Sequence, residues 1–274
     1  MTTNKPGILF LHGYPLDNRV WSEQLGFLDG HFFLFRPNFP GFGETGPAET
    51  NVYAIDGSSP IYISLEFTDW TSLAGLSDWL ANAIDQLHDM LPTVPDKWIV
   101  CGLSMGGYVA LEFWKRHRHR VAGLVLTNTK ASIDDDKAIA NRLAVVEQAK
   151  SLGSDSVTLP MLPKLLAQSS MEKNPKVVAR VEAMMRSISS TTISRSQQAM
   201  IFRDSFMDDL GVIDVPTLVL AGARDVITPG SLMESMAAKI PQSYFKVIED
   251  AGHLAPMENP ADWNSEFLSF LAKL

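Results

Sequence analysis

The chain has 274 residues, of which 46% are hydrophobic and 20% are charged, and its net charge is −8. This length suits one domain with an insertion, and the composition is that of a globular protein with a sizeable core. The acidic balance disfavours nucleic acid or an anionic membrane surface as the main partner.

The chain begins MTTNKPGILFLHGYP, with one lysine and a five-residue apolar run. That run is too short for the core of a signal peptide. No apolar stretch approaches the ~18 residues of a membrane span. We therefore expect a soluble, cytoplasmic protein without a membrane partner, although a signal sequence removed beforehand would leave no trace.

Six short apolar runs predict buried strands, at 7–11, 32–35, 98–102, 122–128, 216–222 and 244–249. Segments of helical period lie between several of them, notably 72–91 and 107–117. This alternation predicts an α/β fold with a mostly parallel sheet of about six strands, covered by helices on both faces. Cys101, the only cysteine, lies within one run and is expected to be a small buried hydrophobe, not a disulfide or zinc ligand.

Residues 51–67 resemble two short strands around an Asp-Gly-Ser-Ser-Pro turn. Two interpretations stay open for this segment. It is either a hairpin near the mouth of an active site or a plain surface excursion.

The alternation stops after Asn128, and residues 132–210 contain helical segments without a convincing strand. We therefore predict a core in two parts, 1–131 and 211–274, with a helical cap at 132–210 over one end of the sheet. The cap has ten basic and ten acidic residues, so it offers no net positive field for an anionic substrate. It holds six of the twelve methionines, and gap filling among cap helices is the favoured role over lining an adaptable pocket.

The segment Gly102-Leu103-Ser104-Met105-Gly106-Gly107 joins a predicted strand to a predicted helix. A sharp turn of this kind exposes a nucleophilic serine at its apex, and residues two before and two after the serine must be small. Ser104 is therefore the predicted nucleophile. The helix start offers the free N–H of Met105 to an oxyanion.

Two further loops supply the partners that a serine nucleophile needs. Asp225 follows the strand at 216–222, and His253 follows the last strand. His253 is the predicted base, and Asp225 would orient it, in the chain order Ser, Asp, His that this turn predicts. Asp250 competes as the acid but lies only three residues from His253, and Asn128 is not an acid.

The first strand ends in FLHGYP, where Gly13 lets the backbone turn toward the serine. We expect the N–H of Tyr14 to be the second oxyanion donor. The side chains of Tyr14, Leu254 and Met257 are predicted to line the substrate pocket. His12 is expected to be a structural hydrogen bonder instead of a second base.

Five segments together resemble the α/β-hydrolase superfamily: FLHGYP, RPNFPGFGET, CGLSMGGYVA, LAGARDVITP and EDAGHLAPMENP, which run from residue 10 to 260. The resemblance implies the α/β-hydrolase fold with a cap. CGLSMGGYVA and AGHLAPMENP are similar to the branch of enol-lactone hydrolases, small carboxylesterases and cofactor-free haloperoxidase-like proteins. Ser104 excludes relatives with an aspartate nucleophile, namely haloalkane dehalogenases and epoxide hydrolases.

Two departures from the family pattern matter. The antiparallel strand pair that usually precedes the His-Gly strand is missing, which leaves a sheet edge that segment 51–67 is a candidate to cover. Asn38 stands where the family often has Asp, and we expect this to affect the loop and not the triad.

We predict a serine hydrolase that cleaves a small carboxylic ester or lactone through an acyl-enzyme, without a metal or organic cofactor. The same triad would also serve C–C bond hydrolysis or hydroxynitrile cleavage, and a capped pocket would serve a non-enzymatic ligand receptor. The partner in each case is a small molecule. The sequence leaves the natural substrate and the formation of a homo-oligomer open.

Overall fold

The computed structural model describes residues 5–28, 30–43, 49–53, 61–64 and 70–274. Its centre is an eight-stranded sheet in the order β4-β3-β2-β1-β5-β6-β7-β8. Six of these strands pair in parallel: β1 (Gly7–Leu11), β2 (Leu34–Arg36), β5 (Trp98–Leu103), β6 (Val121–Thr127), β7 (Thr217–Gly222) and β8 (Ser243–Ile248). The predicted parallel sheet is confirmed, with strand ends displaced by at most two residues.

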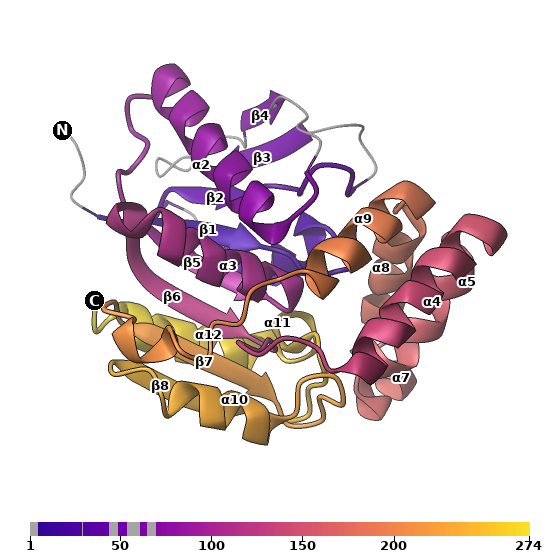
Figure 1. The fold of residues 1–274 in the computed structure, drawn as a ribbon. Coiled ribbons are helices and arrows are strands. Elements are labelled where there is room, and N and C mark those ends of the chain that lie inside the picture. Colours follow the sequence, from indigo (N-terminus) through magenta and orange to yellow (C-terminus); the bar gives the residue numbers. More distant parts are fainter. Residues whose placement is uncertain (1–4, 29, 44–48, 54–60, 65–69) are drawn as a thin grey trace.

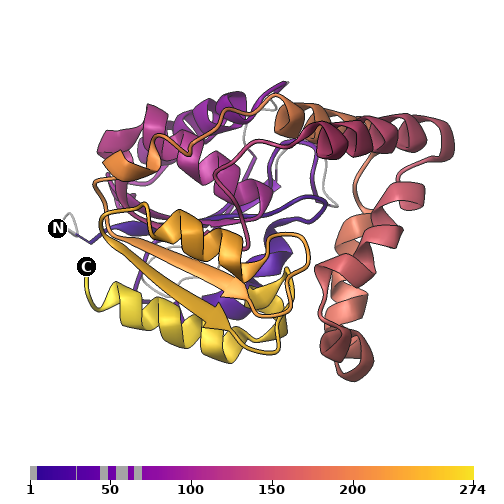
Figure 2. The same ribbon diagram turned by 60° about the horizontal axis from the view of Figure 1, so that its bottom comes forward.

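Helices cover both faces of the sheet, as Figures 1 and 2 show. Alternate residues of β1 point to opposite sides, so Leu9 and Leu11 enter one core cluster while Ile8 and Phe10 enter the other. The first cluster includes residues of α2 (Leu73–Met90), α3 (Met105–Arg116) and α10 (Gly230–Ala237). The second includes residues of the 3-10 helix η1 (Asn18–Trp21), α1 (Ser22–Leu28), α11 (Ala255–Glu258) and α12 (Pro260–Leu271).

Helix α2 begins where the hydroxyl of Ser72 accepts a hydrogen bond from Gly75 N at 3.0 Å. Its apolar face buries Leu76 and Leu80 against the sheet. In the described ranges, no helix combines the length and apolar character that crossing a bilayer requires.

Of the two interpretations left open for 51–67, the structure has the paired strands of a hairpin in the part that it describes, and the place of this hairpin at the mouth of an active site stays a prediction. β3 (Glu49–Tyr53) pairs antiparallel with β2, and β4 (Ile61–Ser64) pairs antiparallel with β3. The two strands therefore extend the sheet beyond β2 and cover the edge that would otherwise be open (Figure 1). The predicted turn lies at 56–60, outside the described residues.

The chain between β6 and β7 contains helices and no strand from residue 136 to residue 201. They are α4 (Asp136–Leu152), α5 (Asp155–Thr158), η3 (Leu159–Met161), α6 (Leu162–Leu165), α7 (Gln168–Lys173), α8 (Pro175–Arg186) and α9 (Ser190–Ile201), with η2 (Arg118–Arg120) before β6 and η4 (Leu210–Val212) before β7. Figures 1 and 2 place α4, α5, α7, α8 and α9 together at one end of the sheet. Met184, Met185 and Met200 are buried there as core side chains. The bounds of the cap as a separate unit, 132–210, stay a prediction.

Candidate active site

Ser104 occupies the sharp turn between β5 and α3. Its backbone has φ 55° and ψ −116°, a left-handed conformation that costs a non-glycine residue about 1–3 kcal/mol. Its backbone is held by neighbouring segments: Ser104 N donates to Thr127 O at 3.0 Å, and Ser104 O accepts from the hydroxyl of Thr129 at 2.8 Å and from Gly107 N at 2.9 Å. The residue remains half-buried, so the turn presents the hydroxyl at the end of the sheet.

The glycines around Ser104 are required by close backbone contacts. A Cβ atom at Gly102 would overlap the carbonyl oxygen of Gly106, and a Cβ at Gly106 would overlap the carbonyl oxygen of Leu11. Because these neighbours are backbone atoms, they cannot move aside as a side chain would. Small residues two before and two after the serine are therefore required, at Gly102 by the turn itself and at Gly106 by the neighbouring strand β1.

Asp225 and His253 form a buried hydrogen-bonded pair. Nδ1 of His253 lies 2.8 Å from Oδ2 of Asp225, and both side chains are almost fully buried. Asp225 is in the loop after β7, and His253 is in the loop after β8. These loops meet because the carboxyl ends of parallel strands share one edge of the sheet.

Asp225 is held by four hydrogen bonds besides the one to His253. The hydroxyl of Thr228 and the amide of Asn128 donate to Oδ2 at 2.6 and 2.7 Å, and the N–H groups of Ile227 and Thr228 donate to Oδ1. Burial raises the pKa of the Asp225 carboxyl, but His253 and the hydrogen bonds outweigh it and lower the pKa to about 2. An ionised carboxylate only accepts hydrogen bonds, so Nδ1 of His253 donates and Nε2 is left as the base.

Two partners of Asp225 are not among the residues that the sequence predicts for the site. Asn128 and Thr228 both donate to Asp225. Asn128 has a positive φ of 46°, and the amino-acid composition does not predict this backbone conformation. Asp250, the rival acid, is exposed in the turn after β8.

Ser104 is at the same edge of the sheet as the His253 and Asp225 pair, because all three follow carboxyl ends of parallel strands. Among the described residues, no hydrogen bond joins the hydroxyl of Ser104 to His253. Such contacts are often long without substrate and tighten in the reactive complex. The structure thus brings together the predicted acid and base. It places the predicted nucleophile at the same end of the sheet, beyond the carboxyl ends of the parallel strands.

Two backbone N–H groups flank Ser104 without a partner in the described part of the chain, those of Tyr14 and Met105. Met105 is the first residue of α3, so its N–H has no acceptor within the helix. The loop that carries Tyr14 lies against the serine, since a Cβ atom at Gly13 would come within 3.0 Å of Ser104 Cβ. Both N–H groups are the ones that the sequence predicted as oxyanion donors, and that role stays a prediction.

His12 connects the Gly13 loop to the loop after β2. Its Nε2 accepts a hydrogen bond from Phe39 N at 3.0 Å, and its Nδ1 lies 3.0 Å from Gly13 O. Because Nε2 is the acceptor, Nδ1 carries the proton and donates to Gly13 O. Complete burial lowers the pKa of His12 to about 4, against the raising effect of the Gly13 contact and of Asp17. The expectation of a structural His12 is confirmed.

Asn38 serves the same loop. Its side-chain oxygen accepts a hydrogen bond from Asn18 N at 2.7 Å, and its amide nitrogen packs on Gly43. The acid that contacts His253 is Asp225, and the effect of Asn in place of Asp at position 38 stays a prediction.

The three side chains predicted to line a pocket are buried. Leu254 and Met257 belong to the second core cluster, and Tyr14 belongs to the first. The hydroxyl of Tyr14 lies beside Gln197 of α9 but outside hydrogen-bonding geometry, and burial raises the pKa of Tyr14 to about 12. The pocket-lining role of these residues stays a prediction.

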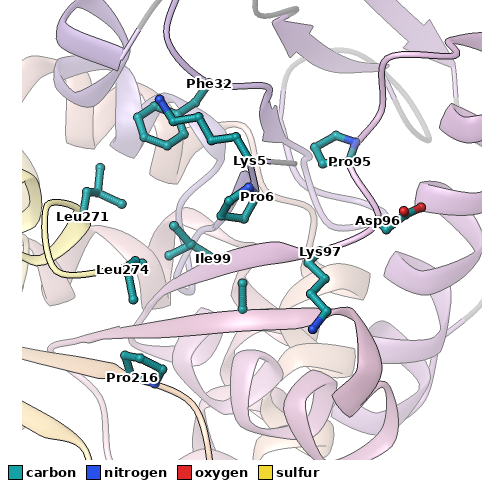
Figure 3. A pocket seen from close by; sticks show the side chains of 11 residues that line it. Lys5, Pro6, Phe32, Pro95, Asp96, Lys97, Ile99, Pro216, Leu271 and Leu274 are labelled. Atoms are coloured by element: carbon teal, nitrogen blue, oxygen red, sulfur yellow. The ribbon is translucent and has the colours of Figure 1, made fainter. Parts of the chain in front are cut away.

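A cavity of about 990 Å³ is separate from this site, and Figure 3 shows the side chains that line it. It lies at the amino ends of β1 and β5, whereas Ser104 follows the carboxyl end of β5. Ligand sites of parallel sheets lie beyond the carboxyl ends of the strands, so this cavity is not the candidate active site. Within the described ranges, no three His, Cys, Asp or Glu side chains gather as metal ligands, and the expectation of a cofactor-free site stays a prediction.

Comparison with known proteins agrees with this arrangement. The pimeloyl-[acyl-carrier protein] methyl ester esterase of Aromatoleum aromaticum is 26% identical over 94% of this chain and 95% of its own length. The 3-oxoadipate enol-lactonase 1 of Acinetobacter baylyi is 22% identical over 99% of this chain and 90% of its own. The structure of a thermophilic esterase from Thermogutta terrifontis, solved with malate bound, is 33% identical and superposes with a TM-score of 0.85 over 99% of this chain and 91% of its own.

The family model described as the alpha/beta hydrolase fold matches residues 6–260. This range contains the turn at Ser104 and the loops of Asp225 and His253, and it covers most of the chain. The chain therefore belongs to the alpha/beta hydrolase family.

Proposed function

We propose that the protein is a serine hydrolase that cleaves small carboxylic esters or lactones through an acyl-enzyme. The observation that carries this proposal is the 2.8 Å contact between Asp225 and His253, made at the sheet edge where Ser104 is presented. The esterase and enol-lactonase among the relatives support the substrate class.

In the proposed mechanism, Nε2 of His253 takes the proton of the Ser104 hydroxyl as Oγ attacks the carbonyl carbon. The C–O bond to the alcohol breaks as His253 returns the proton to the leaving oxygen. Asp225 keeps the ring in the required tautomer and stabilises the imidazolium. Water, activated by the same histidine, then hydrolyses the acyl-enzyme.

The oxyanion of each tetrahedral intermediate would be stabilised by the N–H groups of Tyr14 and Met105. Both are fixed in place before the reaction, since Met105 begins a helix and the loop of Tyr14 is held by His12. A preorganised pair of donors is worth several kcal/mol, because losing one donor typically costs about 2.7–4 kcal/mol of activation free energy.

The experiment is hydrolysis of nitrophenyl esters from acetate to decanoate by the wild type and by Ser104→Ala. We expect turnover by the wild type and none above background by the variant, with both proteins folded by circular dichroism. Equal esterase activity in a clean Ser104→Ala preparation would contradict the assignment. A wild type that is labelled at Ser104 by a fluorophosphonate but hydrolyses no ester would favour C–C substrates or ligand retention instead.

A further inference from the structure

Glu258 bridges the loop of His253 to the short connection between α6 and α7 and to α7 itself. Its Oε1 accepts hydrogen bonds from Gly252 N at 2.8 Å and from Leu254 N at 3.1 Å. Its Oε2 accepts hydrogen bonds from Ala167 N and from the hydroxyl of Ser170, both at 2.7 Å. One side chain thus joins two segments that are about 90 residues apart in sequence.

The amides bonded to Oε1 are the immediate neighbours of His253 in the chain. The N–H of His253 itself donates to Leu165 O at 3.0 Å, so three consecutive amides are bound by Glu258 and by the end of α6. The contact is close: a Cβ atom at Gly252 would lie 2.6 Å from Ala167 N. The backbone of His253 is therefore held by the side chain of Glu258 and by the carbonyl group of Leu165.

The charge of Glu258 matters for this arrangement. Its four partners are all donors, so both oxygens act as acceptors and the side chain works as a carboxylate. Burial raises the pKa of Glu258, and the hydrogen bonds from Ser170 and the backbone oppose that rise. Hydrogen bonds to an ionised acceptor are stronger than those between neutral groups.

We propose that Glu258 is a positioning residue, which aligns the ring of His253 with Ser104 and couples that alignment to docking of the segment 165–170 on the core. It does not touch the reacting atoms. This inference rests on the proposed function, because it requires His253 to be the base. Its effect follows from geometry, since a misplacement of about 1 Å at a catalytic group can cost roughly 100-fold in rate.

Glu258→Gln is the sharpest variant, because it keeps the shape and removes one acceptor. The amide nitrogen must face either the amides of Gly252 and Leu254 or that of Ala167, so at least one bond becomes a clash between donors. Ser170→Ala is the milder variant, because it removes one bond to Oε2 and leaves both bonds to the His253 loop. Glu249→Gln is the matched control, since Glu249 is exposed and lies four residues before His253.

The measurement is the second-order rate of Ser104 labelling by a fluorophosphonate, with kcat and KM on the best nitrophenyl ester and the thermal midpoint of each variant. We expect Glu258→Gln to slow labelling and lower kcat by roughly 10- to 100-fold with KM within about threefold, and Ser170→Ala to slow both by roughly 2- to 5-fold. Glu249→Gln should match the wild type. A purely structural Glu258 would lower the thermal midpoint and leave the labelling rate unchanged below it.

Wild-type labelling of Glu258→Gln, measured well below its thermal midpoint, would overturn the positioning role. If Glu258→Gln does not fold, Ser170→Ala decides: slowed labelling with a folded protein supports the role, and an unchanged rate overturns it. Failure of the proposed function has a different signature, because the wild type itself would then hydrolyse no ester, whether or not it takes up the label at Ser104.

Discussion

The amide of Asn128 donates a hydrogen bond of 2.7 Å to the same oxygen of Asp225 that faces His253. Asn128 follows β6, the strand between the one that leads to Ser104 and the one that leads to Asp225. It also lies 3.3 Å from Gly252 O in the His253 loop. One amide therefore links the acid loop to the loop of the base.

Replacing Asn128 tests this link. We expect Asn128→Ala to lower kcat by roughly 10- to 150-fold, because losing a hydrogen bond to a charged group costs about 1.5–3 kcal/mol and about 1.4 kcal/mol is a factor of ten. Asn128→Gly is the control for the backbone, since Asn128 has a positive φ that glycine adopts without strain. Ester hydrolysis should give similar kcat values for the two variants. Urea unfolding should give a higher free energy of unfolding for Asn128→Gly than for Asn128→Ala. Wild-type kcat in both would show that Asp225 does not depend on this amide.

His12 predicts a specific pH dependence of stability. Its pKa is about 4 in the folded protein and near 6.5 in an unfolded chain, so the unfolded state binds more protons between these values. The contribution of His12 to the free energy of unfolding is complete above about pH 6.5. It declines as the pH falls toward 4, by up to about 1.4 kcal/mol per pH unit.

Urea unfolding of the wild type and of His12→Gln from pH 7.5 to 4.5 measures this effect. Glutamine does not titrate, and its side-chain oxygen can still accept from Phe39 N. We expect the wild type to lose more stability than the variant over this range. Parallel curves would mean that His12 titrates normally in the folded protein.

Close packing around the glycines of the sharp turn at Ser104 leads to a further prediction. A Cβ atom at position 106 would overlap the carbonyl oxygen of Leu11, which belongs to the neighbouring strand β1. We expect Gly106→Ala to lower the free energy of unfolding by about 2–3 kcal/mol and to abolish Ser104 labelling, because overpacking displaces the backbone at the nucleophile.

Gly26→Ala is the matched control for this substitution. Gly26 lies within α1, and no neighbouring atom is within 4 Å of its added Cβ. Alanine there should leave labelling unchanged and stabilise by about 0.5–1 kcal/mol, because glycine is costly inside a helix. Equal effects of Gly106→Ala and Gly26→Ala on labelling and on the free energy of unfolding would contradict the role of close packing at the turn of Ser104.

The sequence predicted those parts of the site that depend on local geometry. Ser104 could be assigned because Gly102 and Gly106 are explained only by a sharp turn, and the strand and helix on either side were readable from apolar periodicity. Asp225 and His253 followed from their order and from the strands before them. Apart from the chain order of Ser104, Asp225 and His253, each of these features depends on residues within about ten positions of one another.

Contacts between distant segments were not readable in this way. Asn128 looks like an ordinary polar residue until β6 and β7 are placed side by side, and Glu258 gains its role only when Ala167 and Ser170 dock against it. The hairpin strands were recognisable, but the pairing of β3 with β2 depends on which edge of the sheet remained open. Tertiary pairing, and not local propensity, determines these features.

The most direct test of the account is the site of fluorophosphonate labelling, read by intact-protein mass and peptide mapping of the wild type and Ser104→Ala. A triad of Ser104, His253 and Asp225 predicts one adduct per chain, on Ser104, and none on the variant. No adduct on a folded wild type, or the same adduct on Ser104→Ala, would contradict it.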